Sequence, residues 1–196
     1  MYVRRQDGEL LLLTVHVDDQ LIACNSRSGL DKFKAQLNNA FECSSSGAAG
    51  YFLGVNIHRD RKNRKLYISQ EHYMEALLER HNMVTCNPAT NIMPSGFRAM
   101  PATDEQHEEA KHLPYPSIAG AILYASTITR PDLAFVAGVL CRYISKWSIE
   151  HWKLAKHVLR YIRGTTDLCL TFDGDCGERI VLGYADADWG GDLDTR

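Results

Sequence analysis

The chain has 196 residues, of which 45% are hydrophobic and 23% are charged, and its formal net charge is −2. This length allows one or two domains with buried cores, and the balanced charge means that any signal for nucleic-acid binding must be local. The six cysteines lack the spacing of a zinc site or a disulfide framework, and no apolar run is long enough to span a membrane, so we expect a soluble, intracellular protein with reduced thiols and no membrane partner.

Two adjacent carboxylates, Asp18 and Asp19, interrupt an apolar stretch near the start of the chain. Leu11 to Val15 and Leu21 to Ala23 are typical of two strands, which places both carboxylates at the tip of a tight β-hairpin. Like charges side by side need compensation, and oxygen ligands of this kind suit Mg²⁺ (or Mn²⁺). The pattern predicts a metal-dependent site that handles phosphates. The alternative is an Asp-Asp turn whose side chains lie in water.

The next segment predicts one helix and a second hairpin. Leu30 to Phe41 carries apolar residues at spacings of three and four, which is typical of an amphipathic helix. Tyr51 to His58 and Lys65 to Ser69 are interpreted as paired strands. The turn between them, residues 58–65, holds five cations in eight residues, Arg61 and Lys62 among them. Such a tip can hold a nucleic-acid backbone, or it is simply a solvated turn.

The second half of the chain predicts helices. Ser69 is a good N-cap for a helix over Gln70 to Asn82. Residues 85–116 hold most of the prolines and little periodicity, so we expect an exposed, partly disordered connection. Three further helices are then expected: Ile118 to Thr127, capped by Ser117; Asp132 to Ile144, begun by Pro131; and Ile149 to Arg163.

The last of these helices opposes an apolar face to a cationic stripe. The stripe, at spacings of three and four, consists of Lys153, Lys156, Arg160 and Arg163. This arrangement fits a helix that is docked on a core and faces phosphates outside. A basic face that only meets water is the alternative. Two strands, Leu168 to Phe172 and Arg179 to Tyr184, are expected to follow.

The hairpin carrying Asp18 and Asp19 resembles the Tyr-x-Asp-Asp palm hairpin of reverse transcriptases, in particular those of Ty1/copia-type LTR retrotransposon polyproteins. His16-Val17-Asp18-Asp19 stands where that family has Tyr-Val-Asp-Asp. Four further stretches follow in the same order as in copia-type proteins: Tyr51 to Val55, Ala125 to Asp132, His151 to Thr165, and Gly183 to Asp192. Together they span nearly the whole chain.

The resemblance implies an α+β chain with three parts. Residues 1–69 would be the C-terminal part of the polymerase palm with a hairpin that is similar to the primer grip. Residues 70–164 would form the helical thumb and connection, with an exposed loop at about 85–116. Residues 165–196 would begin an RNase H-like domain. The family also carries fingers and another metal-binding Asp before this region, so the chain is expected to be a fragment.

The resemblance also assigns roles to residues. Asp18 and Asp19 would help to hold two Mg²⁺ ions for nucleotidyl transfer, and Asp186 would match the first metal-binding carboxylate of RNase H. His16 replaces the Tyr that lies close to the nascent base pair. The primer-grip-like hairpin would bring Phe52, Leu53 and Gly54 to the nucleic acid, and the basic tip and the cationic helix stripe would contact the duplex.

The function implied by the resemblance is RNA-directed DNA polymerisation. The partners of the intact parent would be an RNA or DNA template–primer and deoxynucleotides, in the cytoplasm (in a virus-like particle) or in the nucleus. We expect this chain to be inactive alone, both as a polymerase and as an RNase H. The alternative is a non-catalytic relic of a retroelement that binds nucleic acid or a protein. A receiver-like phosphoacceptor domain is disfavoured, because regular βα alternation is missing.

Overall fold

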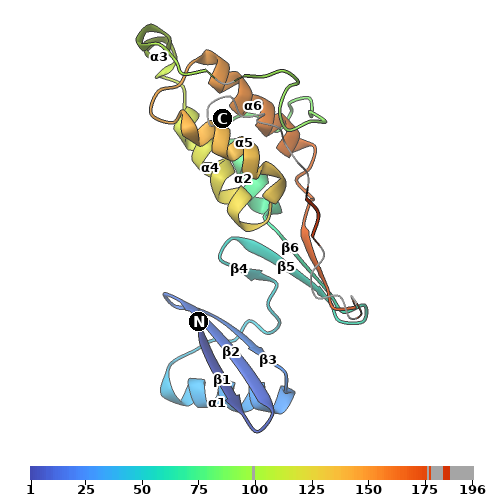
Figure 1. The fold of residues 1–196 in the computed structure, drawn as a ribbon. Helices are drawn as coiled ribbons and strands as arrows, with labels where there is room; N and C mark the ends of the chain where they lie inside the picture. The colour runs from blue at the N-terminus through green and yellow to red at the C-terminus, as the bar shows by residue number, and fades with distance from the viewer. Residues whose placement is uncertain (99, 176, 178–182, 186–196) are drawn as a thin grey trace.

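A computed structural model describes residues 1–98, 100–175, 177 and 183–185. Figure 1 shows three parts along the chain: a small sheet with one helix, a second sheet, and a group of packed helices. The first sheet has the strand order β1-β2-β3 and the second β4-β5-β6-β7. The mixed composition of helices and antiparallel sheets agrees with the predicted α+β class.

The first part is a three-stranded meander that packs on one helix. Its elements are β1 (Tyr2–Gln6), β2 (Glu9–His16), β3 (Asp19–Cys24) and α1 (Arg27–Ala40). Leu11 is 4% exposed. Its register partner Arg4 lies over the ring of Phe33, 5.7 Å from the ring centroid, so this face of the sheet packs on α1. The predicted hairpin is confirmed. The helix begins three residues before the predicted Leu30, because the hydroxyl of Ser26 accepts a hydrogen bond from the Gly29 amide.

The second sheet contains β4 (Tyr51–Phe52), β5 (Val55–Asp60), β6 (Lys65–Ser69) and β7 (Leu170–Asp173). The prediction of one strand from Tyr51 to His58 is wrong. Phe52 pairs with Val55 across a two-residue turn in which Leu53 and Gly54 both have positive φ, at 49° and 83°. Positive φ at both central residues is the signature of a tight hairpin turn, which splits the segment into two strands.

Strand β7 adds to this sheet from far along the chain. It pairs antiparallel with β6, with Ile68 opposite Leu170 and Lys65 opposite Asp173. The predicted strand Leu168 to Phe172 is therefore present with shifted ends, but it lies in one sheet with residues 51–69. The partner expected for it, Arg179 to Tyr184, lies mostly outside the described residues.

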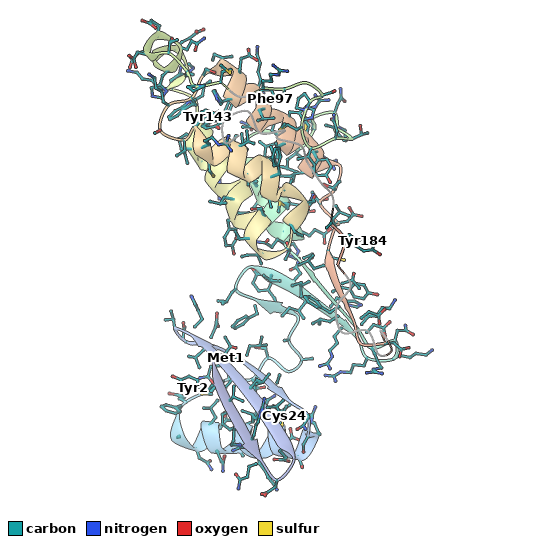
Figure 2. All side chains as sticks on the ribbon, viewed as in Figure 1. Met1, Tyr2, Cys24, Phe97, Tyr143 and Tyr184 are labelled. Carbon is teal, nitrogen blue, oxygen red and sulfur yellow. The ribbon has the colours of Figure 1, made fainter. Side chains whose placement is uncertain are left out.

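The helices form the main hydrophobic core. They are α2 (Glu71–Arg80), α3 (Asp104–Ala110), α4 (Tyr115–Ile128), the short 3₁₀ helix η1 (Pro131–Leu133), α5 (Ala134–Arg142) and α6 (Ile149–Arg163). Their inward faces bury Leu77, Ile118, Ile122, Leu140 and Leu159, among others. Trp147 and Trp152 pack against this core. Figure 2 draws the side chains of these helices on the ribbon.

The connection from Thr85 to Pro116 differs from its prediction as a partly disordered segment. It contains α3, which begins with a capping box between Thr103 and Gln106. Ala89, Ala102 and Ala110 are buried along it. These small alanine side chains form no helical pattern in the sequence, although they are buried in the structure.

Helix starts were placed less accurately than helix bodies. The N-caps of α2 and α4 are Gln70 and Pro114, in place of the predicted Ser69 and Ser117. Pro131 opens the 3₁₀ turn η1, and α5 follows it directly. The predicted bounds of α6 are confirmed.

Candidate functional site

Asp18 and Asp19 lie at the tip of the β2–β3 hairpin. His16 is the register partner of Asp19, so the loop consists of only Val17 and Asp18. All four side chains are exposed, and Val17 is 86% exposed. The tip lies at the same end of the sheet as Met1, because Tyr2 pairs with Leu13 near the end of β2 (Figure 1). A two-residue loop fixes the backbone of both carboxylates on a paired scaffold.

Val17 holds an unusual backbone conformation at this tip. Its φ is 55°, in the left-handed region, where a β-branched residue is a genuine outlier. Such conformations persist only where the surroundings impose them, and they concentrate at functional sites. Here the pairing of His16 with Asp19 imposes it. The strain therefore follows from the tight turn that carries the two carboxylates.

The described residues do not by themselves complete a magnesium site. Asp18 and Asp19 are hard oxygen donors of the kind Mg²⁺ prefers. However, no group of three or more His, Cys, Asp or Glu side chains in the described part of the chain is placed to hold a metal ion. Two exposed carboxylates are fewer ligands than a two-metal centre requires. Any such centre needs further ligands.

The turn that resembles the primer grip lies against the helical part. A Cβ on Gly54 would meet the hydroxyl of Tyr124, on α4, at 3.2 Å. Phe52 is partly buried and Leu53 is 38% exposed. Tyr124 in turn packs edge-on against Tyr73, with ring centroids 5.0 Å apart. The turn thus lies next to Tyr124 of α4, while Leu53 stays open to solvent.

The basic tip between β5 and β6 carries exposed cations. Arg61 and Lys62 are both exposed, and neither side chain has a hydrogen-bond or ion-pair partner among the described residues. Asp60 accepts hydrogen bonds from the backbone and the side chain of Asn63, which close the turn and lower the pKa of the Asp60 carboxyl. The tip therefore presents free positive charge on an ordered turn.

The four cations of α6 have unequal surroundings. Lys153 forms an ion pair with Glu150 at 2.7 Å, and Lys156 is exposed with no partner in the described ranges. Arg160 Nε donates to the carbonyl of Asn87 at 2.7 Å, and Arg163 Nε donates to that of Val84 at 2.6 Å. The two arginines therefore fasten the connection to α6, a role that the sequence pattern did not reveal.

Arg130 is the most deeply buried charge described, and sequence reasoning assigned it no role. Its guanidinium forms an ion pair with Asp132 and donates to the backbone and the hydroxyl of Thr165. Beside it, Thr129 donates to Gln70 at 2.9 Å. The stretch Thr129 to Asp132 was noticed only as part of the copia-like pattern. The structure shows that it joins α2, η1 and the end of α6.

Two remaining expectations concern the chain end and membranes. Asp186 lies outside the described residues, as do Asp188 and Asp192. Tyr184 is described and is 91% exposed. Within the described ranges, no helix has both the length and the apolar character needed to cross a bilayer.

Comparison with known proteins supports the resemblance. Residues 1–94 match the family described as reverse transcriptase (RNA-dependent DNA polymerase). The chain is 37% identical over 199 residues to the retrovirus-related Pol polyprotein from transposon TNT 1-94 of Nicotiana tabacum, across 100% of this chain and 15% of that protein. It is 30% identical over 195 residues to the Pol polyprotein from transposon RE2 of Arabidopsis thaliana, across 99% of this chain and 13% of that protein.

A shorter relative covers nearly the same region. An uncharacterised mitochondrial protein of Arabidopsis thaliana is 29% identical over 186 residues, across 95% of this chain and 75% of that protein. No solved structure matches the chain. The chain spans about one seventh of the tobacco polyprotein that it matches. The family match over residues 1–94 and the similarity to transposon Pol polyproteins together support this chain as a fragment of a retrotransposon reverse transcriptase.

Proposed function

We propose that the chain supplies part of the active site and part of the duplex-binding surface of an RNA-directed DNA polymerase. The observation that carries this proposal is the position of Asp18 and Asp19, which lie within the segment that matches reverse transcriptases and at the tip of a two-residue hairpin. The partners would be an RNA or DNA template–primer and deoxynucleotides.

Asp18 and Asp19 would provide only part of the metal-ligand set. When bound, Mg²⁺ would activate the primer hydroxyl and stabilise the leaving pyrophosphate. Because the described residues gather no third carboxylate at this tip, the remaining ligands have to come from another segment of polypeptide. We therefore expect the chain alone to bind the ion weakly and not to extend a primer.

Three cationic positions are proposed to contact backbone phosphates: the tip residues Arg61 and Lys62, and Lys156 on α6. Their side chains are exposed and have no ion-pair partner in the described part of the chain. The other cations of α6 would add to the positive potential of this helix, although each already has one protein partner; they are Lys153, Arg160 and Arg163. Binding through such residues releases counterions and weakens as salt rises.

The proposal extends to the carboxyl-terminal stretch only by sequence. Residues 183–192 resemble the opening strand of a copia-type RNase H domain, and Asp186 would be its first metal-binding carboxylate. One carboxylate cannot serve two-metal hydrolysis. We expect no cleavage of an RNA/DNA hybrid by this chain alone.

Primer extension and metal binding test the active-site half of the proposal. With Mg²⁺, a labelled primer on an RNA template should stay unextended, and robust incorporation would overturn the need for further ligands. Mn²⁺ gives a second readout, because it broadens the amide resonances of residues near its site. Broadening should centre on residues 16–20 and disappear in the Asp18→Asn/Asp19→Asn variant. Broadening that persists in that variant would refute the assignment of both carboxylates.

Duplex affinity tests the other half. The triple variant Lys153→Ala/Lys156→Ala/Arg160→Ala should bind a labelled RNA/DNA hybrid more weakly than the original chain, and added salt should weaken both. Affinity that does not change with salt would remove the phosphate contacts from the proposal.

A further inference from the structure

Strand β7 brings two carboxylates into the basic tip of the β5–β6 hairpin. Asp173 ends β7 opposite Lys65, and Asp175 follows two residues later. The amide of Gly174 donates to the carbonyl of Arg64 at 2.9 Å, so the two turns lie against each other. A Cβ on Gly174 would lie 2.9 Å from that carbonyl oxygen, too close for a larger residue. The carboxylates are therefore held beside the cations by backbone contact.

The charges at this junction form loose, exposed pairs. Arg64 Nη1 lies 3.7 Å from Asp175 Oδ1, and Lys65 Nζ lies 3.6 Å from Asp173 Oδ2. All four side chains are at least 39% exposed. Ion pairs of this kind contribute little to stability, because water competes for both partners. Another anion can therefore easily replace the carboxylates in these pairs.

An open pocket lies between the two turns. Its volume is about 380 Å³, and it is lined by Lys62, Asn63, Arg64, Lys65, Asp173 and Asp175. Four of these residues offer N–H donors, whereas the two carboxylates occupy the positions that an incoming anion would take. The pocket is large enough for a phosphate group and its neighbouring sugar. A phosphate would meet the same Arg64 and Lys65 that the carboxylates now hold.

We propose that Asp173 and Asp175 are intramolecular competitors of backbone phosphates at the basic tip, so that the β7 turn tunes the affinity of this chain for nucleic acid. This inference rests on the proposed role of the tip in phosphate binding. Arg64 prefers a bidentate, charge-assisted contact with a phosphate over its present 3.7 Å pair. Exchange of one anion for the other frees the Asp175 carboxylate into water, while Asp173 Oδ1 keeps its hydrogen bond from the amide of Asp175 at 2.9 Å.

Single isosteric substitutions test the competition. Asp175→Asn removes one charge, keeps the side-chain volume and leaves the backbone of the turn intact. Asp7→Asn is the matched control, because it removes the same negative charge at the β1–β2 turn, at the opposite end of β2 from Asp18. Asn also tolerates the positive φ of residue 7, which is 50°. Arg61→Ala/Lys62→Ala reports separately whether the tip binds phosphate.

Affinity for a short fluorescein-labelled RNA/DNA hybrid is measured by anisotropy on the full chain. At about 50 mM salt, Asp175→Asn should bind about fivefold more tightly than the original chain, which corresponds to the upper range of an exposed ion pair. Asp7→Asn should change affinity by less than about twofold. The affinity of Asp175→Asn should fall more steeply with salt, by the amount expected for about one additional phosphate contact. Asp173→Asn should act in the same direction.

The outcomes separate the two proposals. If Asp175→Asn binds no better than Asp7→Asn while Arg61→Ala/Lys62→Ala binds more weakly, the competition is refuted and the basic tip keeps its role. If Arg61→Ala/Lys62→Ala binds as well as the original chain, phosphate binding at the tip is refuted, and the competition with it.

Discussion

Arg130 and Asp132 form a two-pronged ion pair at the start of η1. Arg130 Nε lies 3.0 Å from Asp132 Oδ1, and Nη2 lies 2.8 Å from Oδ2. The Arg130 side chain is 2% exposed and also donates to the carbonyl and the hydroxyl of Thr165, each at 2.9 Å. The ring of Tyr161 lies 5.7 Å from the guanidinium, and its hydroxyl donates to Asp132. This network joins η1 to the end of α6.

The Arg130 network predicts that even a conservative substitution of Arg130 lowers the free energy of unfolding substantially. Arg130→Lys keeps the charge but cannot bond to Asp132 and Thr165 at once, because an ammonium lacks the planar fork. We expect the free energy of unfolding to fall by about 2–3 kcal/mol, below the full cost of breaking a buried pair because Asp132 is partly exposed. Urea unfolding measures this. Arg98→Lys, on an exposed residue, should change it by less than about 0.5 kcal/mol.

The pKa of Asp132 reflects the same arrangement. Burial alone would raise it, but the hydrogen bond and the charge of Arg130, with the hydrogen bond from Tyr161, outweigh burial and lower it. Because the pKa is lower in the folded state, this stabilisation is present at neutral pH and is lost as the pH falls below about 4.

A buried histidine predicts a second, milder pH effect. His151 Nδ1 accepts hydrogen bonds from the backbone amide of Ser148, at 3.1 Å, and lies 2.8 Å from its hydroxyl. Protonation of Nδ1 would remove the acceptor that caps α6. Burial lowers the pKa of His151 against the smaller opposing effect of Glu150. The unfolded chain therefore binds more protons, and stability should decrease as the pH falls through about 6.5.

His151→Gln tests this effect while keeping the cap. A Gln at this position of a capping box can accept the same amide hydrogen bond, and it does not titrate. Urea unfolding at pH 7 and at pH 5 should show a smaller difference in this variant. Burial also lowers the pKa of His81, so some pH dependence should remain until His81→Gln is added. An unchanged difference in the double variant would contradict the role of both histidines.

The cationic face of α6 predicts two kinds of variant. Arg160→Ala removes a 2.7 Å hydrogen bond to the carbonyl of Asn87, so it should lower the free energy of unfolding by about 1–2 kcal/mol and speed proteolysis of the segment 84–91. Lys156→Ala removes only an exposed charge, so it should weaken duplex binding without changing stability. If Arg160→Ala is no less stable than Lys156→Ala, the hydrogen bond from Arg160 to Asn87 does not stabilise the fold.

Local patterns in the sequence predicted much of the fold. The hairpin around Asp18 and the helix from Ile149 to Arg163 follow from apolar periodicity over a few residues, and both are confirmed. The turn at Leu53 and Gly54 was missed because Leu rarely adopts positive φ, so nothing but the glycine marked it. The turn also lies next to the hydroxyl of Tyr124, from a distant part of the chain, which no local pattern could reveal.

Long-range relationships could not be predicted in this way. The pairing of Ile68 with Leu170 joins strands that are separated by the whole helical part, and no local pattern specifies it. The ion pairs of Asp173 and Asp175 with the basic tip follow from that pairing. Arg130 is buried where three elements from distant parts of the chain meet, so its burial could not be predicted from neighbouring residues. The role of the candidate carboxylates stays a prediction, since the described residues do not complete a metal site.

The strained tip of the β2–β3 hairpin gives the last prediction. Val17 has a φ of 55° and is 86% exposed, so its side chain gains no packing in return for a conformation that costs about 1–2 kcal/mol. Asn adopts this region readily, because its short polar side chain bonds locally. Val17→Asn should therefore stabilise the hairpin by about 1 kcal/mol, measured as slower amide hydrogen exchange in β2 and β3. Val17→Thr, which stays β-branched, should leave exchange unchanged. Faster exchange in Val17→Asn would show that the apolar side chain itself holds the tip.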